Sequence, residues 1–312
     1  MERRVHPALA GVVEAQRAVP RVHPATQGIE QRRAEFLRDP LAQWASPDAM
    51  VDTRDLSLTG RAGPIPARLY VPPTLHGRGL VVYFHGGSYV LGDLESHDGV
   101  CRRIAQHVGV RLLAIHYRRA PEHPFPAAVD DAIDATREAY RRRAELGDPD
   151  DPLVVMGDSA GATLATDVAA ALAREPERPV GQVLFYPTLG PQLMTASAQE
   201  FRQGYGIDLD HLRYDYGQYL QGRDPMDPRV SPLFARNMGA SAQAIMVIAA
   251  CDPLRDEDVA YAGLLEHYGV RVELLEAEGM IHGFIRFGGT VPEVLAILDE
   301  VSEHLHRLLS PS

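Results

Sequence analysis

The sequence predicts an α/β protein, with one doubly wound domain built around a mostly parallel β-sheet. Three observations support this prediction. Short apolar runs alternate with helical patterns from about residue 51 onward, as in consecutive βαβ units. The middle runs are almost continuously apolar, as expected for parallel strands that helices cover on both faces. The chain of 312 residues is long enough for one large α/β domain.

Strands are expected where apolar, β-rich runs end at polar or turn residues. These runs are Ala67–Val71, Leu80–His85, Arg111–His116, Leu153–Met156, Gln182–Tyr186, Ile245–Ala250 and Arg271–Leu275. Helical spacing of apolar residues predicts helices at Pro7–Arg17, around Gln27–Leu37, and at about 96–109, 126–145, 160–174, 255–268 and 291–309.

One long segment interrupts this alternation. More than fifty residues separate the strand ending near Tyr186 from the strand beginning near Ala244, and a simple connection needs far fewer. We therefore expect residues 189–232 to form a helical cap insertion over the carboxyl edge of the sheet, joined by N-terminal cap helices in residues 1–48. The core then comprises residues 49–188 and 233–312. The alternative is a long surface excursion without functional meaning.

The inserted segment is rich in tyrosine. These side chains either line a pocket for an aromatic or oxygenated substrate or belong to ordinary cap packing, which we favour. They are Tyr205, Tyr214, Tyr216 and Tyr219.

Composition limits the classes of partner. The net charge of −11 disfavours nucleic acid, because phosphate contacts need clustered positive charge. No stretch approaches the roughly 20 apolar residues that a membrane helix requires, and no apolar core of signal-peptide length follows the first charged residues. Cys101 and Cys251 make neither a disulfide framework nor a metal-spaced pair. We therefore expect a cytoplasmic protein that has no metal site and binds neither nucleic acid nor membrane.

The strongest chemical signal is Gly157-Asp158-Ser159-Ala160-Gly161, which lies between a predicted strand and an alanine-rich helical pattern. A serine nucleophile must project from a sharp strand-to-helix turn, and glycines two residues before and after it let the neighbouring strand and helix approach. The turn also directs the Ala160 N–H toward a developing oxyanion. The alternative is that Ser159 only caps the helix.

A second signal, His85-Gly86-Gly87-Ser88-Tyr89, closes an upstream strand. Adjacent glycines at a strand end let backbone N–H groups turn toward one point, and acyl transfer needs such donors where negative charge develops on the carbonyl oxygen. His85 comes before the turn, so we expect it to hold this loop rather than to act as a base.

The base and its acidic partner should follow the serine in the order acid, then histidine. Asp252 directly follows the apolar run that ends near Ala250, whereas Asp256 and Asp258 read as first-turn charges of a helix. His282 lies in a loop just past a strand, from which it can reach Ser159. The other histidines that follow a candidate acid lie in helical patterns; they are His267, His304 and His306.

Taken together, these motifs resemble the hormone-sensitive-lipase-like family of microbial carboxylesterases, within the α/β-hydrolases. The resemblance extends from about residue 80 to 287, in the family's order. The matching segments are His85-Gly86-Gly87, Gly92-Asp93-Leu94-Glu95, Tyr117-Arg118, Ala120-Pro121-Glu122-His123-Pro124-Phe125-Pro126-Ala127-Ala128, Gly157-Asp158-Ser159-Ala160-Gly161, Tyr186-Pro187, Ser231-Pro232-Leu233, Asp252-Pro253-Leu254-Arg255-Asp256-Glu257 and His282-Gly283-Phe284.

The resemblance implies the α/β-hydrolase fold: a mostly parallel eight-stranded sheet flanked by helices, with a helical cap. It implies hydrolysis of small-molecule esters with short to medium acyl groups, through an acyl-serine intermediate and without a cofactor. Many members form dimers, so a homodimer is a further expectation. The implied catalytic triad is Ser159, Asp252 and His282. The implied oxyanion hole uses the N–H groups of Gly87, Ser88 and Ala160, with Gly86 in the same loop.

The sequence departs from the family pattern at several positions. Ser88 replaces a common third glycine, where only a backbone N–H is required. The cap stretch Leu212-Arg213-Tyr214-Asp215-Tyr216 is more polar than the family's aromatic-rich stretch, which makes the substrate the least defined property. His116, Arg119 and Ala162 stand where aspartate, leucine and glycine are usual.

Two alternatives to ester hydrolysis remain open. The triad permits hydrolysis of a lactone or an activated amide in secondary metabolism. The second alternative is a non-hydrolytic, ligand-binding relative of the family, or a scaffold repurposed for cyclisation or elimination. Such relatives typically lose a triad member, whereas all three candidates are present here.

Overall fold

The computed structural model describes residues 4–18, 22–39, 51–289 and 291–310. An eight-stranded sheet has the order β1-β2-β4-β3-β5-β6-β7-β8. The pairs β1–β2 and β2–β4 are antiparallel, and all other neighbours are parallel. This confirms the predicted fold class. The strands are β1 (Asp52–Gly60), β2 (Gly63–Val71), β3 (Leu80–Phe84), β4 (Arg111–Ile115), β5 (Leu153–Asp158), β6 (Gly181–Phe185), β7 (Gln243–Cys251) and β8 (Val272–Ile281).

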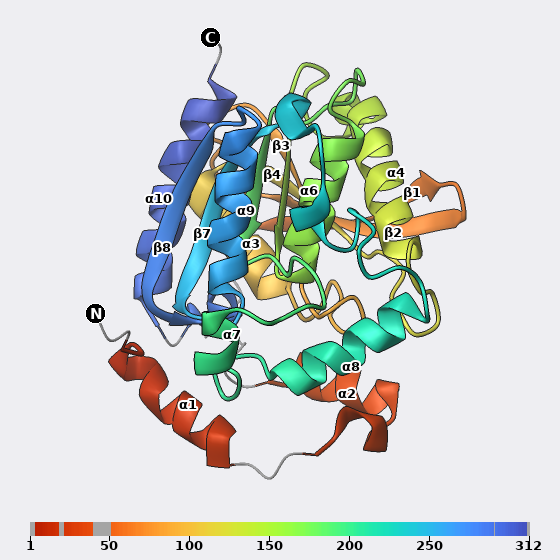
Figure 1. Cartoon of the computed structure of the whole chain (residues 1–312). Coiled ribbons are helices and arrows are strands. Elements are labelled where there is room, and N and C mark those ends of the chain that lie inside the picture. Colours follow the sequence, from red (N-terminus) through yellow and green to blue (C-terminus); the bar gives the residue numbers. More distant parts are fainter. Residues whose placement is uncertain (1–3, 19–21, 40–50, 290, 311–312) are drawn as a thin grey trace.

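Helices cover both faces of the sheet (Figure 1). On β3, Leu80, Val82 and Phe84 pack into the core cluster on one face, while Val81 and Tyr83 pack into the cluster on the other. This two-sided burial explains why the central strands are continuously apolar. One face carries α4 (Ala127–Arg141), α6 (Ala160–Ala171) and α9 (Arg255–His267), and the other carries α3 (Asp98–Val108) and α10 (Glu293–Leu309). The short helices are α5 (Arg143–Leu146), η3 (Pro232–Phe234), η4 (Met238–Ala240) and η5 (Phe284–Phe287).

The N-terminal edge of the sheet differs from the sequence prediction. No strand was predicted over Asp52–Gly60, and β2 begins at Gly63 rather than near Ala67. Most of β1 is exposed and polar, so the strand lacks the apolar run that identifies a buried one. Pro64 and Pro66 argue against a strand, but both lie before Ala67, where the ladder between β2 and β4 begins. On that side the Pro66 carbonyl only accepts, from the His116 N–H at 2.9 Å, so the missing proline N–H groups interrupt no bond to β4.

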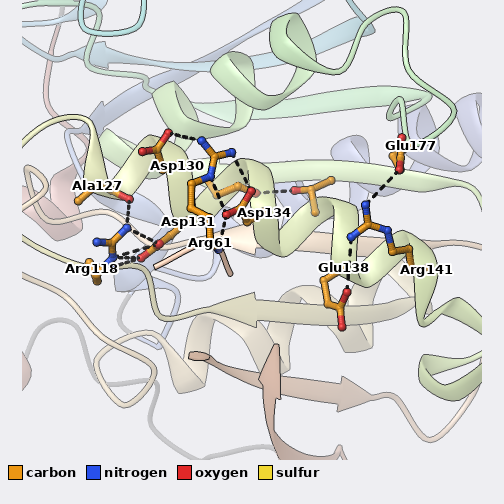
Figure 2. A network of polar contacts seen from close by, with 11 residues as sticks. Arg61, Arg118, Ala127, Asp130, Asp131, Asp134, Glu138, Arg141 and Glu177 are labelled. Carbon is orange, nitrogen blue, oxygen red and sulfur yellow. Dashed lines mark hydrogen bonds and ion pairs between the residues drawn. The ribbon is translucent and has the colours of Figure 1, made fainter. Parts of the chain in front are cut away.

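Carboxylates on α4 connect this helix to the edge hairpin and to the segment after β4 (Figure 2). Arg61, in the β1–β2 turn, donates to Asp134 at 2.8 Å and to Asp130 at 3.1 Å. Arg118 donates to the buried Asp131 at 2.8 Å. The partly buried pair with Asp131 contributes more to stability than the exposed Arg61 pairs, since solvent screens exposed ion pairs.

Four helices lie together at one end of the sheet, at the bottom of Figure 1. They are α1 (Pro7–Ala18), α2 (Ile29–Leu37), α7 (Ala196–Glu200) and α8 (Leu209–Leu220), with the short η1 (Pro24–Thr26) before α2. The predicted boundary between residues 48 and 49 lies outside the described residues. Within the described parts of the chain, none of the helices combines the length and hydropathy needed to cross a bilayer.

Candidate active site

Ser159 occupies a sharp turn between β5 and α6. Its backbone angles are φ 53° and ψ −121°, a conformation that L-residues rarely adopt and that costs about 1–3 kcal/mol. A Cβ added to Gly161 would lie 2.0 Å from the Phe84 carbonyl oxygen, and one on Gly157 would lie 2.4 Å from the Gly161 carbonyl. Both glycines are therefore required by close backbone packing. The Ser159 side chain makes no helix-capping bond, which excludes the alternative of a simple N-cap.

The structure brings Ser159, His282 and Asp252 together. His282 Nε2 lies 3.0 Å from Ser159 Oγ, and His282 Nδ1 lies 2.8 Å from Asp252 Oδ2. The other carboxylate oxygen of Asp252 accepts a hydrogen bond from the Leu254 N–H at 2.8 Å. All three residues are buried, with whole-residue exposures of 5% or less. An acyl-transfer site needs this order of hydroxyl, imidazole and carboxylate.

Parallel strands explain why residues so distant in sequence meet. Ser159, Asp252 and His282 each follow directly after a strand, namely β5, β7 and β8. The carboxyl ends of parallel strands share one edge of a sheet, and functional residues gather there. The His282 N–H donates to the Tyr205 carbonyl at 3.0 Å, so the inserted segment holds the base in place. The rejected histidines lie on helices α9 and α10, as predicted; they are His267, His304 and His306.

The loop after β3 presents backbone N–H groups near Ser159. Gly87, Ser88 and Tyr89 all have positive φ, at 120°, 55° and 63°, and the Gly87 carbonyl accepts from Val90 at 3.0 Å and from Leu91 at 2.7 Å. The loop is thus a tight turn that Ser88 can adopt without the family's third glycine. Gly87, Ser88 and Ser159 line the same cavity. Within the described residues, the N–H groups of Gly87, Ser88 and Ala160 have no protein acceptor.

Gly86 differs from its three neighbours in the predicted oxyanion set. Its N–H donates to Asp158 Oδ1 at 2.9 Å, so it is not available to a substrate oxygen. The same carboxylate oxygen accepts from the Tyr83 hydroxyl at 2.6 Å, and His97 Nε2 lies 3.6 Å from Asp158 Oδ2. Gly86 therefore contributes by fixing the loop to the residue that precedes Ser159.

Asp158 was missed as a functional position by the sequence analysis. Burial raises the pKa of its carboxyl, but the nearby His97 imidazole and the hydrogen bond from Tyr83 outweigh burial and lower the pKa to about 2. The ionised carboxylate then joins the oxyanion loop to the nucleophile turn. The only local signal was the position beside Ser159, since Tyr83 and His97 are far away in sequence.

His85 supports the loop, in agreement with the prediction. Its Nδ1 lies 2.9 Å from the Gly86 carbonyl oxygen, its ring stacks on Tyr117 with centroids 4.3 Å apart, and the Tyr117 hydroxyl donates to the His85 carbonyl at 2.7 Å. Burial lowers the pKa of His85 well below its ordinary value, as does the neighbouring His97. A buried, neutral ring that faces the loop from behind is a scaffold and not a base.

A cavity of about 190 Å³ opens above Ser159 and His282. Its walls combine apolar and charged side chains from α2, α8, η5 and the loop after β3, namely Arg32, Phe36, Leu91, Leu212, Asp215 and Arg286. Arg32 and Asp215 form a buried bidentate ion pair at 2.7 and 2.9 Å. The predicted tyrosines do not occur among the described lining residues. Tyr216 and Tyr219 are buried instead, and Tyr219 stacks on Tyr89 with centroids 3.9 Å apart, which confirms the packing interpretation for these two side chains.

A serine bonded to an imidazole and a carboxylate, on a strand-to-helix turn beside backbone donors, defines a serine hydrolase. The comparisons with known proteins agree. The family model described as the alpha/beta hydrolase fold matches residues 81–286, and the chain belongs to this family.

Several of the similar proteins are named as esterases or ester hydrolases. The chain is 40% identical over 308 residues to an ethyl acetate hydrolase of Pseudomonas putida, covering 94% of this chain and 96% of that protein. It is 34% identical to an arylesterase of Saccharolobus solfataricus, covering 90% of this chain and 91% of the arylesterase. A hyperthermophilic esterase from the archaeon Pyrobaculum calidifontis has a TM-score of 0.88 at 33% identity, covering 98% of this chain and 99% of the other. The chain is a carboxylic ester hydrolase of the hormone-sensitive-lipase-like group, as the motifs predicted.

Proposed function

We propose that Ser159 is the nucleophile, His282 the general base and acid, and Asp252 the group that orients His282. The observation that carries this proposal is the continuous hydrogen-bonded chain from Asp252 Oδ2 through the imidazole to Ser159 Oγ, at 2.8 and 3.0 Å. A serine hydroxyl attacks poorly at neutral pH until a base takes its proton. Asp252 stabilises the imidazolium that forms and does not itself take the proton.

Two half-reactions follow from this arrangement. Ser159 Oγ bonds to the ester carbonyl carbon while its proton passes to His282 Nε2. The tetrahedral intermediate then collapses, the bond to the alkoxide breaks, and His282 returns the proton to the departing alcohol. Water, deprotonated by His282, attacks the acyl-serine in the same way, and the acid product leaves with Ser159 restored.

The developing oxyanion is bound by backbone donors in this proposal. The N–H groups of Gly87, Ser88 and Ala160 are the candidates, because they have no protein acceptor among the described residues. Removal of one such donor typically costs about 3 kcal/mol of transition-state stabilisation. Gly86 belongs to the loop, but its N–H is bonded to Asp158, so we assign it a positioning role.

We propose short acyl esters as the substrates. The cavity of about 190 Å³ at Ser159 is below the range of about 300–1,000 Å³ that drug-sized ligands occupy. The naming of one relative as an ethyl acetate hydrolase supports an acetyl group or a slightly longer one. We also propose that the two helical segments, residues 1–48 and 189–232, act together as a cap. The support is the Arg32–Asp215 pair and the hydrogen bond from the Gly206 N–H to Gln16 Oε1 at 3.1 Å.

Ser159→Ala tests the nucleophile directly. The variant should lose ethyl acetate turnover by at least 10⁴-fold, since removing a triad member leaves little beyond binding and the oxyanion hole. Circular dichroism and thermal unfolding should match the wild type, because the side chain is small and the turn is held by glycines. Turnover within tenfold of the wild type in a folded variant would reject the proposal.

A cytoplasmic location and a homodimer are further proposals. Two cysteines in 312 residues are typical of a reducing compartment, and cell fractionation tests the location. Strand β8 forms an edge of the sheet and exposes 43% of Leu274, and such edges often pair with another chain. Sedimentation equilibrium tests the dimer, and a monomer at all concentrations would exclude it.

A further inference from the structure

Arg286 brings a buried positive charge to the wall of the catalytic cavity. It lies in η5, shortly after His282 in the chain, and both residues line the cavity at Ser159. Only 8% of Arg286 is exposed. An arginine side chain keeps its charge at any accessible pH, and buried arginines are almost always paired with a carboxylate. A buried arginine at this position therefore calls for a counterion.

The guanidinium of Arg286 has few partners in the protein. Its Nη2 donates to the Phe36 carbonyl at 3.0 Å, and its central carbon lies 3.9 Å from the centroid of the Phe36 ring. Within the described residues, neither Nε nor Nη1 has an acceptor, and no carboxylate forms an ion pair with Arg286. An arginine that packs on an aromatic face keeps the N–H groups in its own plane for hydrogen bonds. The contacts with Phe36 thus hold the side chain in place and leave its charge without a bonded counterion.

The carboxylates in the cavity wall already have donors in the protein. Asp215 is bonded to Arg32 through two hydrogen bonds. Asp158 accepts from a buried hydroxyl and a backbone N–H, and Asp208 accepts from a backbone N–H at the start of α8. A ligand in this cavity therefore meets carboxylates that are already bonded to the protein, and it meets Arg286 with donors still free.

Two of the nearby acidic groups act on Arg286 through space. Burial lowers the pKa of the Arg286 guanidinium, and the charges of Asp39 and Asp158 oppose this shift. These charges reduce the cost of burying the guanidinium, but a charge-assisted hydrogen bond needs heavy atoms about 2.7–2.9 Å apart. Such a bond to Arg286 is left for an anion that enters the cavity.

We propose that Arg286 selects esters that carry a carboxylate in addition to the ester group, and that its guanidinium binds this carboxylate while Ser159 attacks the ester carbonyl. The planar guanidinium matches a carboxylate in charge and in the direction of its N–H groups. The cavity of about 190 Å³ leaves room for only a short spacer between the two groups. This inference rests on the proposed role of Ser159, and it makes neutral short esters such as ethyl acetate poorer substrates than anionic ones.

Two pairs of esters of matched shape test the preference. Monoethyl succinate and ethyl levulinate differ in the acyl part, where a carboxylate oxygen replaces a methyl group. O-acetylglycolate and acetoxyacetone differ in the same way in the alcohol part, so the two pairs show which part of the substrate carries the carboxylate. In at least one pair, we expect kcat/KM for the anionic ester to exceed that for the neutral ester by about 10- to 100-fold, as typical for hydrogen bonds to a charged group.

Variants of Arg286 separate recognition from the intrinsic reactivity of the esters. Arg286→Met removes the charge and keeps an apolar stem beside Phe36, so the preference for the anionic ester should disappear. Arg286→Lys keeps the charge but not the planar guanidinium, and it should retain part of the preference. If Arg286→Met does not fold, Arg286→Gln takes its place, because an amide can still donate to the Phe36 carbonyl. A purely structural role of Arg286 would lower kcat/KM for both esters of a pair by the same factor.

Arg33→Met is the matched control. Arg33 lies on α2, carries the same charge and also donates to backbone carbonyls, those of Val90 and Ala120 at 3.1 and 3.0 Å. It does not occur among the described residues that line the cavity at Ser159. The variant therefore reports the effects of a loosened α2 and of a lost distant charge, and it should leave the kcat/KM ratio within each pair unchanged.

The outcomes distinguish this inference from the proposed function. A wild-type preference for an anionic ester that is lost without the Arg286 charge and kept in Arg33→Met supports the inference. The absence of a preference in both wild-type pairs, or a preference that survives in Arg286→Met or Arg286→Gln, overturns it and leaves the triad assignment intact. A wild-type enzyme that hydrolyses neither ethyl acetate nor any of the four esters would contradict the proposed function itself.

Discussion

The Arg32–Asp215 ion pair offers a quantitative test of the proposed cap. It joins α2 in the N-terminal segment to α8 in the insertion through two hydrogen bonds of 2.7 and 2.9 Å. The two side chains are only 8% and 3% exposed. Removing one partner of such a pair leaves a buried charge without compensation, and this typically costs about 3–5 kcal/mol.

The two single variants should differ in stability. The Asp215 carboxylate can be neutralised by taking up a proton, whereas the Arg32 guanidinium cannot lose its charge. In Asp215→Leu, Arg32 stays charged at any accessible pH, so the full cost of about 3–5 kcal/mol is expected. In Arg32→Met, Asp215 can take up a proton. In the wild type, burial raises the pKa of Asp215, and the hydrogen bonds and charge of Arg32 oppose that rise. Without Arg32 the pKa rises further, so this variant should be most stable at low pH and lose stability as pH rises.

Urea unfolding at pH 5 and pH 8 measures these costs, and hydrogen exchange of α2 and α8 shows whether the loss is local to the cap. The double variant Arg32→Met/Asp215→Leu buries no charge and should recover much of the loss. Because Arg32 and Asp215 line the catalytic cavity, kcat/KM for ethyl acetate should fall in parallel with cap exchange. If the free energy of unfolding of Asp215→Leu stays within about 1 kcal/mol of the wild type and hydrogen exchange of α2 is unchanged, the Arg32–Asp215 pair does not hold the cap together.

Three further changes have defined expectations. Asp252→Asn should lower kcat for ethyl acetate by about 10⁴-fold, because an amide cannot stabilise protonated His282; a loss below tenfold would refute this role. Gly206→Ala should lower kcat/KM by about 10²-fold, since displacements near 1 Å can cost that much and its Cβ would lie 2.0 Å from the His282 carbonyl oxygen. Gly222→Ala has the same φ of +84° but no atom within 4 Å, so it controls for backbone strain and should retain wild-type kcat/KM. Burial raises the pKa of Glu257 to about 7, so the folded state holds this proton more tightly than the unfolded state and wild-type stability falls as pH rises through 7. Glu257→Gln should remove about 2–3 kcal/mol of that fall between pH 5 and 8 in urea unfolding, and equal pH profiles would contradict the assignment.

Local signals made most of the fold predictable. Continuous apolar runs identified β3 to β7, because both faces of these strands are buried. The nucleophile turn was predictable because its steric demands fall on nearby residues: Gly157 and Gly161 leave no room for a Cβ. The positions of Asp252 and His282 followed from the chain order serine, acid, histidine and from their places just after predicted strands.

Features that depend on pairs of distant residues were not predictable from one sequence. The bond from Gly86 to Asp158 removes one expected oxyanion donor, and nothing in the glycine motif distinguishes Gly86 from Gly87. Arg32 and Asp215 lie in two helices that are far apart in the sequence, and no sequence pattern links the two positions. The exposed strand β1 was missed because a polar edge strand has no apolar run, although its partner β2 was partly found.

The most direct test of the account is the site of covalent modification by a fluorophosphonate, mapped by mass spectrometry of proteolytic peptides. The account predicts one adduct, on Ser159, which is absent from Ser159→Ala and forms far more slowly in His282→Ala. A folded, unmodified wild-type protein, or an adduct on any other residue, would contradict it.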